Sequence, residues 1–374
     1  MKTWLNRCVI VHALLACAVL ASAPARADDE EQVLNVYNWG DYIADDTIRN
    51  FEKETGIKVR YDLFDSNEAL HAKLVAGMSG YDIVVPGSHF AKMQIQAGLL
   101  QKLDKSKIPN LANLDPAIQA QLAKMDPGND YLVDWLWGYT TVGINADKAK
   151  MALGSLPMPE NAWDLVFKPE YMAKLKGCGV SFLDTPSEIL PIALKYLGKD
   201  PRSKDPADYK AAGEMLKAVR PYVTRFSGSG SDYIDQMAKG QLCAVIGWSG
   251  DIMIAKDKSK KAHNPQDLQV LLPKMGGLLF FDTMAIPKDA KHKENAYKWI
   301  NFILRPEVDA SLTNKVFYAN PNKAAMKFVD PALAKDKAVF PDAAELAGMI
   351  APDTPDQATL RLVTRTFTNF KANR

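Results

Sequence analysis

Aromatic residues stand close to carboxylates at several places along this chain, each time in a segment with the composition of a loop. In chain order these residues are Trp39 with Asp41 and Tyr42, Trp248 with Asp251, Phe280 with Asp282, and Tyr318. The faces of aromatic rings cover methylene chains and attract ammonium groups, with about 0.5–2 kcal/mol for each desolvated contact. Carboxylates accept strong, charge-assisted hydrogen bonds from the ends of such a chain. The recurring pattern therefore predicts a binding site for a small diammonium compound.

Each of these clusters also has a purely structural interpretation. Aromatic residues at strand ends commonly pack in cores, and loop aspartates commonly cap helices or close turns. Asp251 fits a helix cap, and Glu188, directly after Ser187, fits an acid favoured by the dipole at a helix start. Ser88 and His89 fit either a pocket or a turn. We favour binding because three clusters follow separate predicted strands and can face one cleft.

Sequence motifs of catalysis are absent. There is no Walker loop, no His-Glu-x-x-His, no Cys-x-x-Cys and no dinucleotide fingerprint after the first predicted strand. The segment 247–250, Gly-Trp-Ser-Gly, lacks the glycine spacing of a nucleophile elbow, so an exported hydrolase using Ser249 is the weaker alternative. The histidines at 71, 89, 263 and 292 have no metal-ligand spacing. We expect a protein that is not an enzyme and that holds no metal and no cofactor.

The elements that would position these residues alternate between strand and helix. A first unit has strands over 32–37, 57–63 and 81–85. Its first helix is capped by Asp46 or Thr47 and ends at 55–56. Its second helix is capped by Asn67, has Leu70, Leu74 and Met78 on its apolar face, and ends at Gly80. A second unit has strands over 179–183 and 242–247 around a helix over 187–197. Such alternation implies mainly parallel sheets whose ligand lies beyond the carboxyl ends of the strands. We therefore expect an α/β fold with the aromatic and acidic clusters at those ends.

The length of the chain, set against roughly 100–200 residues per domain, indicates two lobes. Two extended segments, 137–141 and 280–286, are the candidate hinges between them, and a helix over 294–304 follows. We expect residues 28–139 and 282–322 to form the N-terminal lobe, and residues 140–281 and 323–374 to form the C-terminal lobe.

The first residues have the pattern of an export signal. Lys2 and Arg7 precede an apolar stretch over 8–21, and Ala25-Arg26-Ala27 gives a small-x-small cleavage pattern. This stretch is shorter than the roughly 20 residues of a membrane-spanning helix. We expect cleavage near Ala27 and a soluble mature protein over 28–374, with lipidation at Cys17 as the alternative.

Removal of the signal changes the charge and the cysteine content. The mature chain loses Lys2, Arg7 and Arg26 and no acid, so its formal net charge falls from +2 to −1. Such a charge does not fit a nucleic-acid partner. Cys178 and Cys243 remain, and a lone pair in an oxidising compartment favours one disulfide, with two separate buried thiols as the alternative.

Five segments carry a resemblance to a known family. They are YNWGDYI at 37–43, YDIVVP at 81–86, IGWSGD at 246–251, FFD at 280–282 and VFYAN at 316–320. In order and spacing they resemble the periplasmic polyamine-binding proteins of ABC importers, most closely the putrescine-binding members. The resemblance extends over essentially the whole mature chain.

This resemblance implies a two-lobed periplasmic binding protein fold of type II, with the ligand in the cleft between the lobes. The family's pocket residues fall on Trp39, Asp41, Tyr42, Trp248, Asp251, Phe280, Asp282 and Tyr318, with a looser match at Glu188. It also implies a bridge between Cys178 and Cys243. We expect Asp251 and Asp282 to contact the ammonium groups, Trp39, Trp248 and Phe280 to cover the hydrocarbon, and Tyr42, Tyr318 and Ser88 to supply polar or shape contacts.

Four positions depart from the family pattern and bear on which ligand binds. The family has Ser or Thr at the place of Gly40, Ser at the place of Gly87 and a small residue at the place of His89, and Thr185 replaces the usual Ala or Asp. His89 either narrows the cleft or, if protonated, repels a second ammonium.

The expected function is that of a monomeric periplasmic receptor that delivers putrescine to an inner-membrane ABC permease. Agmatine, cadaverine and spermidine remain alternative ligands, as do another cation and a small peptide. A sensory role that uses the same pocket also remains open.

Overall fold

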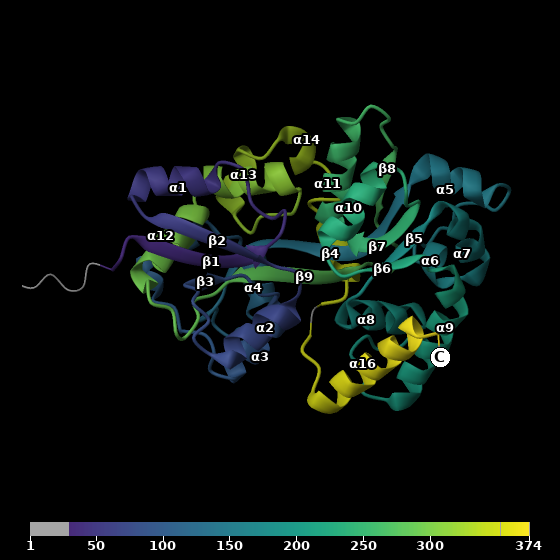
Figure 1. Cartoon of the computed structure of the whole chain (residues 1–374), viewed down its shortest axis with the longest axis horizontal. Coiled ribbons are helices and arrows are strands. Elements are labelled where there is room, and N and C mark those ends of the chain that lie inside the picture. Colours follow the sequence, from purple (N-terminus) through teal and green to yellow (C-terminus); the bar gives the residue numbers. More distant parts are fainter. Residues whose placement is uncertain (1–29, 352, 374) are drawn as a thin grey trace, which may run out of the picture.

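A small parallel sheet forms the first part of the fold (Figure 1). The computed structural model describes residues 30–351 and 353–373. The strands of this sheet are β1 (Val33–Trp39), β2 (Lys58–Phe64) and β3 (Ile83–Val84), in the order β2-β1-β3. They are followed in turn by the helices α1 (Thr47–Thr55), α2 (Asn67–Ala76) and α3 (Ser88–Gln96). In β1, buried Leu34 and Val36 alternate with half-buried residues, as the two-residue period of a strand requires.

A larger sheet of six strands forms the second part. Its strands are β4 (Val133–Asn145), β5 (Val180–Leu183), β6 (Arg225–Ser227), β7 (Ala244–Trp248), β8 (Leu268–Leu271) and β9 (Leu278–Met284). Around it lie α5 (Ala146–Leu153), α6 (Asp164–Phe167), α7 (Pro169–Leu175), α8 (Pro186–Tyr196), α9 (Pro206–Val219), α10 (Gly230–Ala238) and α11 (Ser249–Lys260). Strands β5, β6 and β7 are parallel, whereas β4 is antiparallel to β7, β8 and β9. The predicted α/β class is confirmed, with a second sheet that is mixed.

Strands β4 and β9 run across the middle of the molecule, side by side (Figure 1). The first half of β4 pairs with β9, and its second half pairs with β7 and β8. Strand β9 and the residues after it reach the first part through bridges from Asp282 to Gly87 and from Ala285 to Val84. These strands contain the segments 137–141 and 280–286, whose role as hinges stays a prediction.

The last third of the chain adds helices to both parts. They are α12 (Lys293–Ile303), α13 (Pro306–Val316), α14 (Pro331–Ala334), α15 (Ala343–Gly348) and α16 (Gln357–Lys371), while α4 (Pro116–Leu122) lies earlier. Helix α12 packs against β1, and α16 packs against α8 and α9. A short 3₁₀ turn, Lys323–Lys327, packs against α13. The boundaries predicted for the two lobes stay a prediction.

Helix α2 begins with a different cap from the predicted one. Ser66 is the N-cap residue, because its hydroxyl accepts a hydrogen bond from the backbone N–H of Ala69 at 3.2 Å. The side chain of Asn67 instead accepts a hydrogen bond from the backbone N–H of Gly87 at 2.8 Å. The prediction of Asn67 as cap was wrong by one residue, since Ser66 reaches the free N–H groups first.

The same helix also ends earlier than predicted. It ends at Ala76, where Gly77 follows with a φ of 72°, a conformation that glycine adopts without strain. Gly80 therefore does not close the helix, and Met78 is 93 % exposed and lies outside the apolar face. The four-residue spacing of apolar residues had continued past the residue that ends the helix.

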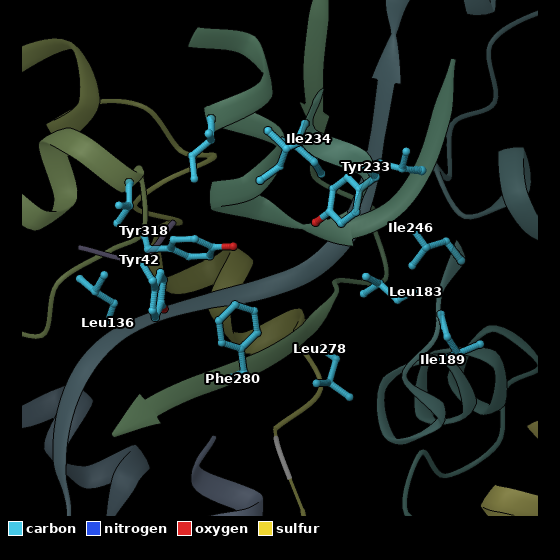
Figure 2. Close-up of a cluster of buried hydrophobic side chains, with 14 of the residues drawn as sticks. Tyr42, Leu136, Leu183, Ile189, Tyr233, Ile234, Ile246, Leu278, Phe280 and Tyr318 are labelled. Atoms are coloured by element: carbon cyan, nitrogen blue, oxygen red, sulfur yellow. The ribbon is translucent and has the colours of Figure 1, made fainter. Parts of the chain in front are cut away.

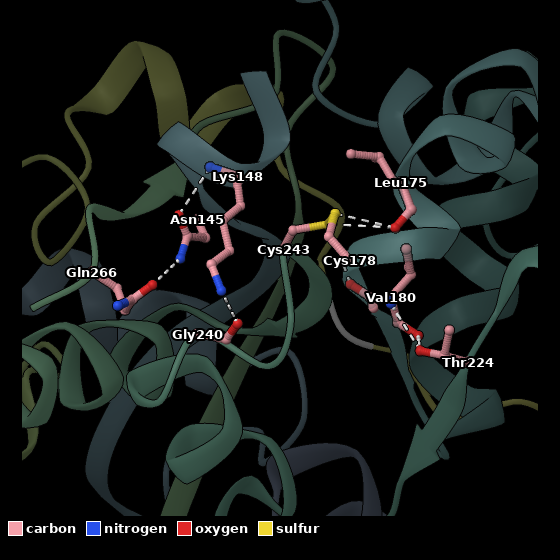
Figure 3. Close-up of a disulfide and its surroundings, with 10 residues drawn as sticks. Asn145, Lys148, Leu175, Cys178, Val180, Thr224, Gly240, Cys243 and Gln266 are labelled. Atoms are coloured by element: carbon pink, nitrogen blue, oxygen red, sulfur yellow. Dashed lines mark hydrogen bonds between the residues drawn. A yellow bond between two sulfur atoms is a disulfide. The ribbon is translucent and has the colours of Figure 1, made fainter. Parts of the chain in front are cut away.

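The disulfide between Cys178 and Cys243 is formed, with 5.5 Å between the two Cα atoms (Figure 3). Cys178 precedes β5, and Cys243 precedes β7, which pairs with β5. The bridge therefore joins the starts of two neighbouring strands, at the opposite end of β7 from Trp248.

No helix within the described residues is long and apolar enough to span a lipid bilayer. The predicted export signal, its cleavage near Ala27 and the alternative lipidation site at Cys17 all lie outside the described residues.

Candidate functional site

The predicted aromatic and acidic clusters meet around one cavity. Its lining, in chain order, is Trp39, Gly40, Asp41, Tyr42, Phe64, Asp65, Asn67, Gly87, His89, Glu188, Ser229, Gly230, Ser231, Ile234, Trp248, Asp251, Phe280, Asp282 and Tyr318. About 710 Å³ of space between these residues is free of protein atoms, including the part that is open to solvent. Five acidic residues and no lysine or arginine belong to this lining. The cavity is therefore suited to a cation.

Asp251 lies in the first turn of α11 and has two phenol partners. The hydroxyl of Tyr318 donates to one carboxylate oxygen at 2.6 Å, and that of Tyr233 donates to the other at 3.0 Å. Burial raises the pKa of Asp251 to about 6, although these two hydrogen bonds oppose the shift. The carboxyl group is thus held in a fixed orientation at the cavity wall.

Asp282 lies on β9 and is held by a single hydroxyl. Tyr42, in the loop after β1, donates to its carboxylate at 3.0 Å. Burial raises the pKa of Asp282 to about 8, and the charges of Glu188 and Asp251 raise it further, against the hydrogen bond from Tyr42. A carboxyl group with one donor and two acidic neighbours gains strongly from a cation beside it.

Glu188 occupies the first turn of α8, as expected, but it is a member of the site as well. The indole N–H of Trp248 donates to its carboxylate at 2.9 Å, and the hydroxyl of Thr140 also donates to it. Burial raises the pKa of Glu188 to about 7, although both hydrogen bonds oppose the shift. Its carboxylate connects α8 with the end of β7.

Aromatic rings form much of the remaining wall. Figure 2 shows Tyr42, Tyr318 and Phe280 close together beside β4 and β9, with the hydroxyl of Tyr233 turned toward that of Tyr318. The ring centroid of Tyr318 lies 5.0 Å from that of Tyr42 and 6.0 Å from that of Phe280. Trp39 is oriented by a 2.9 Å hydrogen bond from its indole N–H to the carbonyl of Val85. These rings leave apolar surface facing the three buried carboxyl groups.

Two of the residues considered earlier do not line the cavity. Ser88 is fully buried at the start of α3, and its hydroxyl has no hydrogen-bond partner among the described residues. Thr185 is the N-cap residue of α8. The neighbours of Ser88 on either side, Gly87 and His89, line the cavity instead, so a ligand contact at Ser88 stays a prediction without geometric support.

Gly87 and His89 pack against each other at the wall. A Cβ atom on Gly87 would lie 3.3 Å from the imidazole of His89 and 3.1 Å from the amide nitrogen of Asn67. Burial lowers the pKa of His89 to about 4, so its ring is neutral near pH 7. Repulsion of an ammonium by a protonated His89 is therefore unsupported, and the bulk of the ring is what changes the cavity.

Sequence reasoning missed part of the lining. These residues are Phe64, Asp65, Asn67, Ser229, Gly230, Ser231 and Ile234. Phe64 ends β2 and Asp65 follows it, so the rule that ligands gather at strand ends would have found them. The segment 229–234 starts a helix, and neither its composition nor its spacing marks it as part of a site.

Ser249, the nucleophile of the hydrolase alternative, is buried and hydrogen-bonds to the backbone. Its hydroxyl accepts a 3.4 Å hydrogen bond from the backbone N–H of Tyr139, and no histidine of the described residues hydrogen-bonds to it. A nucleophile needs a base within reach and an open approach for substrate. The geometry of Ser249 does not fit that role.

Comparison with known proteins identifies relatives over the whole length of the chain. The chain is 47 % identical over 363 residues to the putrescine-binding periplasmic protein SpuD of Pseudomonas aeruginosa, which covers 96 % of this chain and 98 % of that protein. It is 43 % identical to the putrescine-binding periplasmic protein PotF of Escherichia coli, over 100 % of this chain and 99 % of that one. A putative spermidine/putrescine ABC transporter from Listeria monocytogenes superposes with a TM-score of 0.81 at 32 % identity, over 92 % of this chain and 100 % of that chain.

The family model for bacterial extracellular solute-binding proteins matches residues 46–341. This range includes every strand except β1 and every helix from α1 to α14. The relatives SpuD and PotF are themselves periplasmic binding proteins. The chain belongs to the family of bacterial extracellular solute-binding proteins.

Proposed function

We propose that this protein captures a small aliphatic polyamine in the periplasm, with putrescine as the preferred ligand, and delivers it as a monomer to an inner-membrane ABC permease. The carrying observation is the lining of the cavity, which combines five acids and several aromatic rings with no lysine or arginine. The names of the two relatives, both putrescine-binding, support the same ligand class. The protein performs no chemistry of its own in this proposal.

The three buried carboxyl groups explain how such a ligand would be selected. Glu188, Asp251 and Asp282 are each at most 8 % exposed, and burial opposes their ionisation. An ammonium group beside them favours the ionised form and forms charge-assisted hydrogen bonds. A neutral or anionic solute brings no positive charge to these acids, so the cavity discriminates by charge.

The aromatic rings would select for the chain between the two ammonium groups. In this proposal Asp251 and Asp282 contact the ammonium groups, and Trp39, Trp248 and Phe280 cover the methylene chain. Tyr42 and Tyr318 orient the acids through the hydrogen bonds described above. Removal of the hydrocarbon from water contributes roughly 0.8 kcal/mol for each buried CH₂.

Closure of two lobes around the ligand completes the proposal. The lobes are residues 28–139 with 282–322 and residues 140–281 with 323–374, and β4 and β9 act as the hinge. Both strands are long, fully buried and paired with each other, which suits segments that bend without unfolding.

Calorimetric titration of the mature protein tests this function. The protein is first unfolded and refolded to remove any ligand carried through purification, and then titrated with putrescine, agmatine, cadaverine and spermidine in turn. We expect one-to-one binding that is tightest for putrescine. Tighter binding of another amine would correct the ligand but keep the class, whereas no heat with any amine would contradict polyamine capture.

A further inference from the structure

The loop after β1 and the start of α10 meet at the mouth of the cavity. The hydroxyl of Ser231, in the first turn of α10, donates to the carboxylate of Asp41 at 3.1 Å. Asp41 follows a strand of the first sheet, whereas α10 packs against α11 and against β6 and β7 of the second sheet. This hydrogen bond therefore joins the two parts of the fold directly across the opening.

The backbone of Asp41 is strained. Its φ is 53°, in the left-handed region that disfavours residues with a Cβ atom. Strain of this kind persists where surrounding contacts hold a residue in place, and it collects at functional sites. The contact to Ser231 is one such restraint on Asp41.

The start of α10 does not need Asp41 as a cap. Ser229 and Asp232 form a complete capping box, in which each side chain accepts a hydrogen bond from the other residue's backbone N–H. The backbone N–H of Gly228 also donates to Asp232, at 2.9 Å. The contact between Asp41 and Ser231 is thus additional to what the helix requires.

The same turn of α10 lies directly on Asp251. A Cβ atom on Gly230 would fall 2.0 Å from a carboxylate oxygen of Asp251, so the backbone there touches the acid. One turn further, the hydroxyl of Tyr233 donates to Asp251 at 3.0 Å and accepts from the backbone N–H of Trp248 at 2.8 Å. Whatever fixes α10 at the mouth therefore also fixes Asp251 and the backbone of Trp248.

We propose that Asp41 is a positioning residue, which latches the loop after β1 onto α10 through Ser231 and so holds the cavity closed with Asp251 in place. This inference rests on the polyamine-binding function proposed above and assigns Asp41 a different role from the ligand contact predicted from the sequence. Asp41 and Ser231 are both exposed, and water screens a direct attraction between an exposed carboxylate and a buried ammonium. The latch acts on the release of ligand more than on its capture.

Stopped-flow kinetics with putrescine test the latch, using the fluorescence of Trp39 and Trp248, which line the cavity. We expect Ser231→Ala and Asp41→Ala each to raise the dissociation rate constant about twofold to tenfold, the range of one net hydrogen bond. The association rate constant should stay within about twofold, because most interface changes act on dissociation. The double variant should dissociate no faster than the single variants, since both remove the same bond.

The isosteric variant Asp41→Asn separates the latch from a ligand contact. Asparagine keeps an oxygen that accepts from Ser231 and tolerates the left-handed conformation, so we expect dissociation close to that of the wild type. If Asp41→Asn raises the dissociation rate constant as much as Asp41→Ala does, the charge acts on the ligand and the latch is wrong. The latch is also contradicted if the increases in the dissociation rate constant that the two alanine variants cause separately multiply in the double variant.

A matched control is Ser106→Ala. Ser106 is likewise an exposed serine that donates to an aspartate, Asp104, in a segment outside the cavity lining, and its loss should leave both rate constants unchanged. Failure of the wild type to bind any amine of the panel contradicts the proposed function itself, and the latch with it. Binding by the wild type with unchanged kinetics in Ser231→Ala contradicts the latch alone.

Discussion

Neutralisation of Asp282 gives the sharpest test of the buried acids. In Asp282→Asn the side chain keeps its shape and can still accept from the hydroxyl of Tyr42, but it can no longer pair with an ammonium group. Loss of one partner of a buried, hydrogen-bonded charge pair costs about 2–5 kcal/mol in binding. The full loss is not expected here, because the acid starts mostly protonated in the empty cavity.

The size of that correction follows from the raised pKa of Asp282. With a pKa of about 8, ionising the group at pH 7 costs roughly 1.4 kcal/mol, which the wild type must supply on binding and asparagine does not. The net loss of affinity is therefore about 0.6–3.6 kcal/mol, or roughly 3-fold to 400-fold. Calorimetric titration with putrescine at pH 7 measures it, with Asp45→Asn as an exposed control outside the cavity lining.

Thermal unfolding of the empty protein gives an independent result for the same variant. A carboxyl whose pKa is raised from its ordinary 3.8 to about 8 on folding destabilises the folded state as pH rises between those values. At pH 7 the empty Asp282→Asn variant should therefore unfold at a higher temperature than the empty wild type. Affinity within twofold of the wild type, or a lower unfolding temperature without ligand, would refute the reasoning about Asp282.

Three further predictions address pH, the cavity wall and the disulfide. Because the three buried acids have raised pKa values of about 6 to 8, putrescine should bind more tightly as pH rises from about 6 to 8, and its binding should release protons. Calorimetry in buffers of different ionisation heat counts the released protons. An affinity that does not change with pH contradicts this prediction. Gly87→Ser should weaken the binding of putrescine several-fold because the new Cβ atom meets His89 and Asn67. Adding His89→Ser should recover part of the lost affinity, and calorimetric titration of the single and double variants measures both changes. Replacement of Cys178 and Cys243 by serine should lower the free energy of unfolding by about 2–5 kcal/mol, since the bridge closes a loop of 65 residues. The affinity for putrescine should stay unchanged. Weaker binding at a temperature where the variant is folded would count against a purely stabilising bridge.

The sequence predicted β1, β2, β3, β5 and β7 because their signals are local, whereas it gave only parts of β4 and β9 and missed the short strands β6 and β8. Hydrophobic strands that lead into aromatic and acidic residues, such as β1, which ends at Trp39, and β7, which ends at Trp248, appear within a residue or two of their predicted bounds. The errors in α2 arise where two residues compete for one task. Ser66 and Asn67 both cap helices well, and only the backbone path decides which reaches the free N–H groups.

The candidate site was predictable where its residues follow strands and not where a helix approaches from elsewhere. Nine of the ten predicted ligand-binding residues line one cavity, and Ser88 does not. Ser231 and Tyr233 enter the site because α10 folds over Asp251, a tertiary contact with no sequence pattern. The neutrality of His89 also depends on burial, which the sequence does not reveal.

The disulfide has a consequence for the order of events in the life of the chain. The bridge between Cys178 and Cys243 forms in an oxidising compartment and stays open in a reducing cytosol. With the periplasmic location proposed above, the chain lacks this restraint between two neighbouring strands for as long as it is in the cytosol. We propose that it is then easier to unfold for passage across the membrane and that it reaches its full free energy of unfolding only in the periplasm. In this way the redox state of the compartment, and not the sequence alone, decides when the disulfide adds its share to the free energy of unfolding.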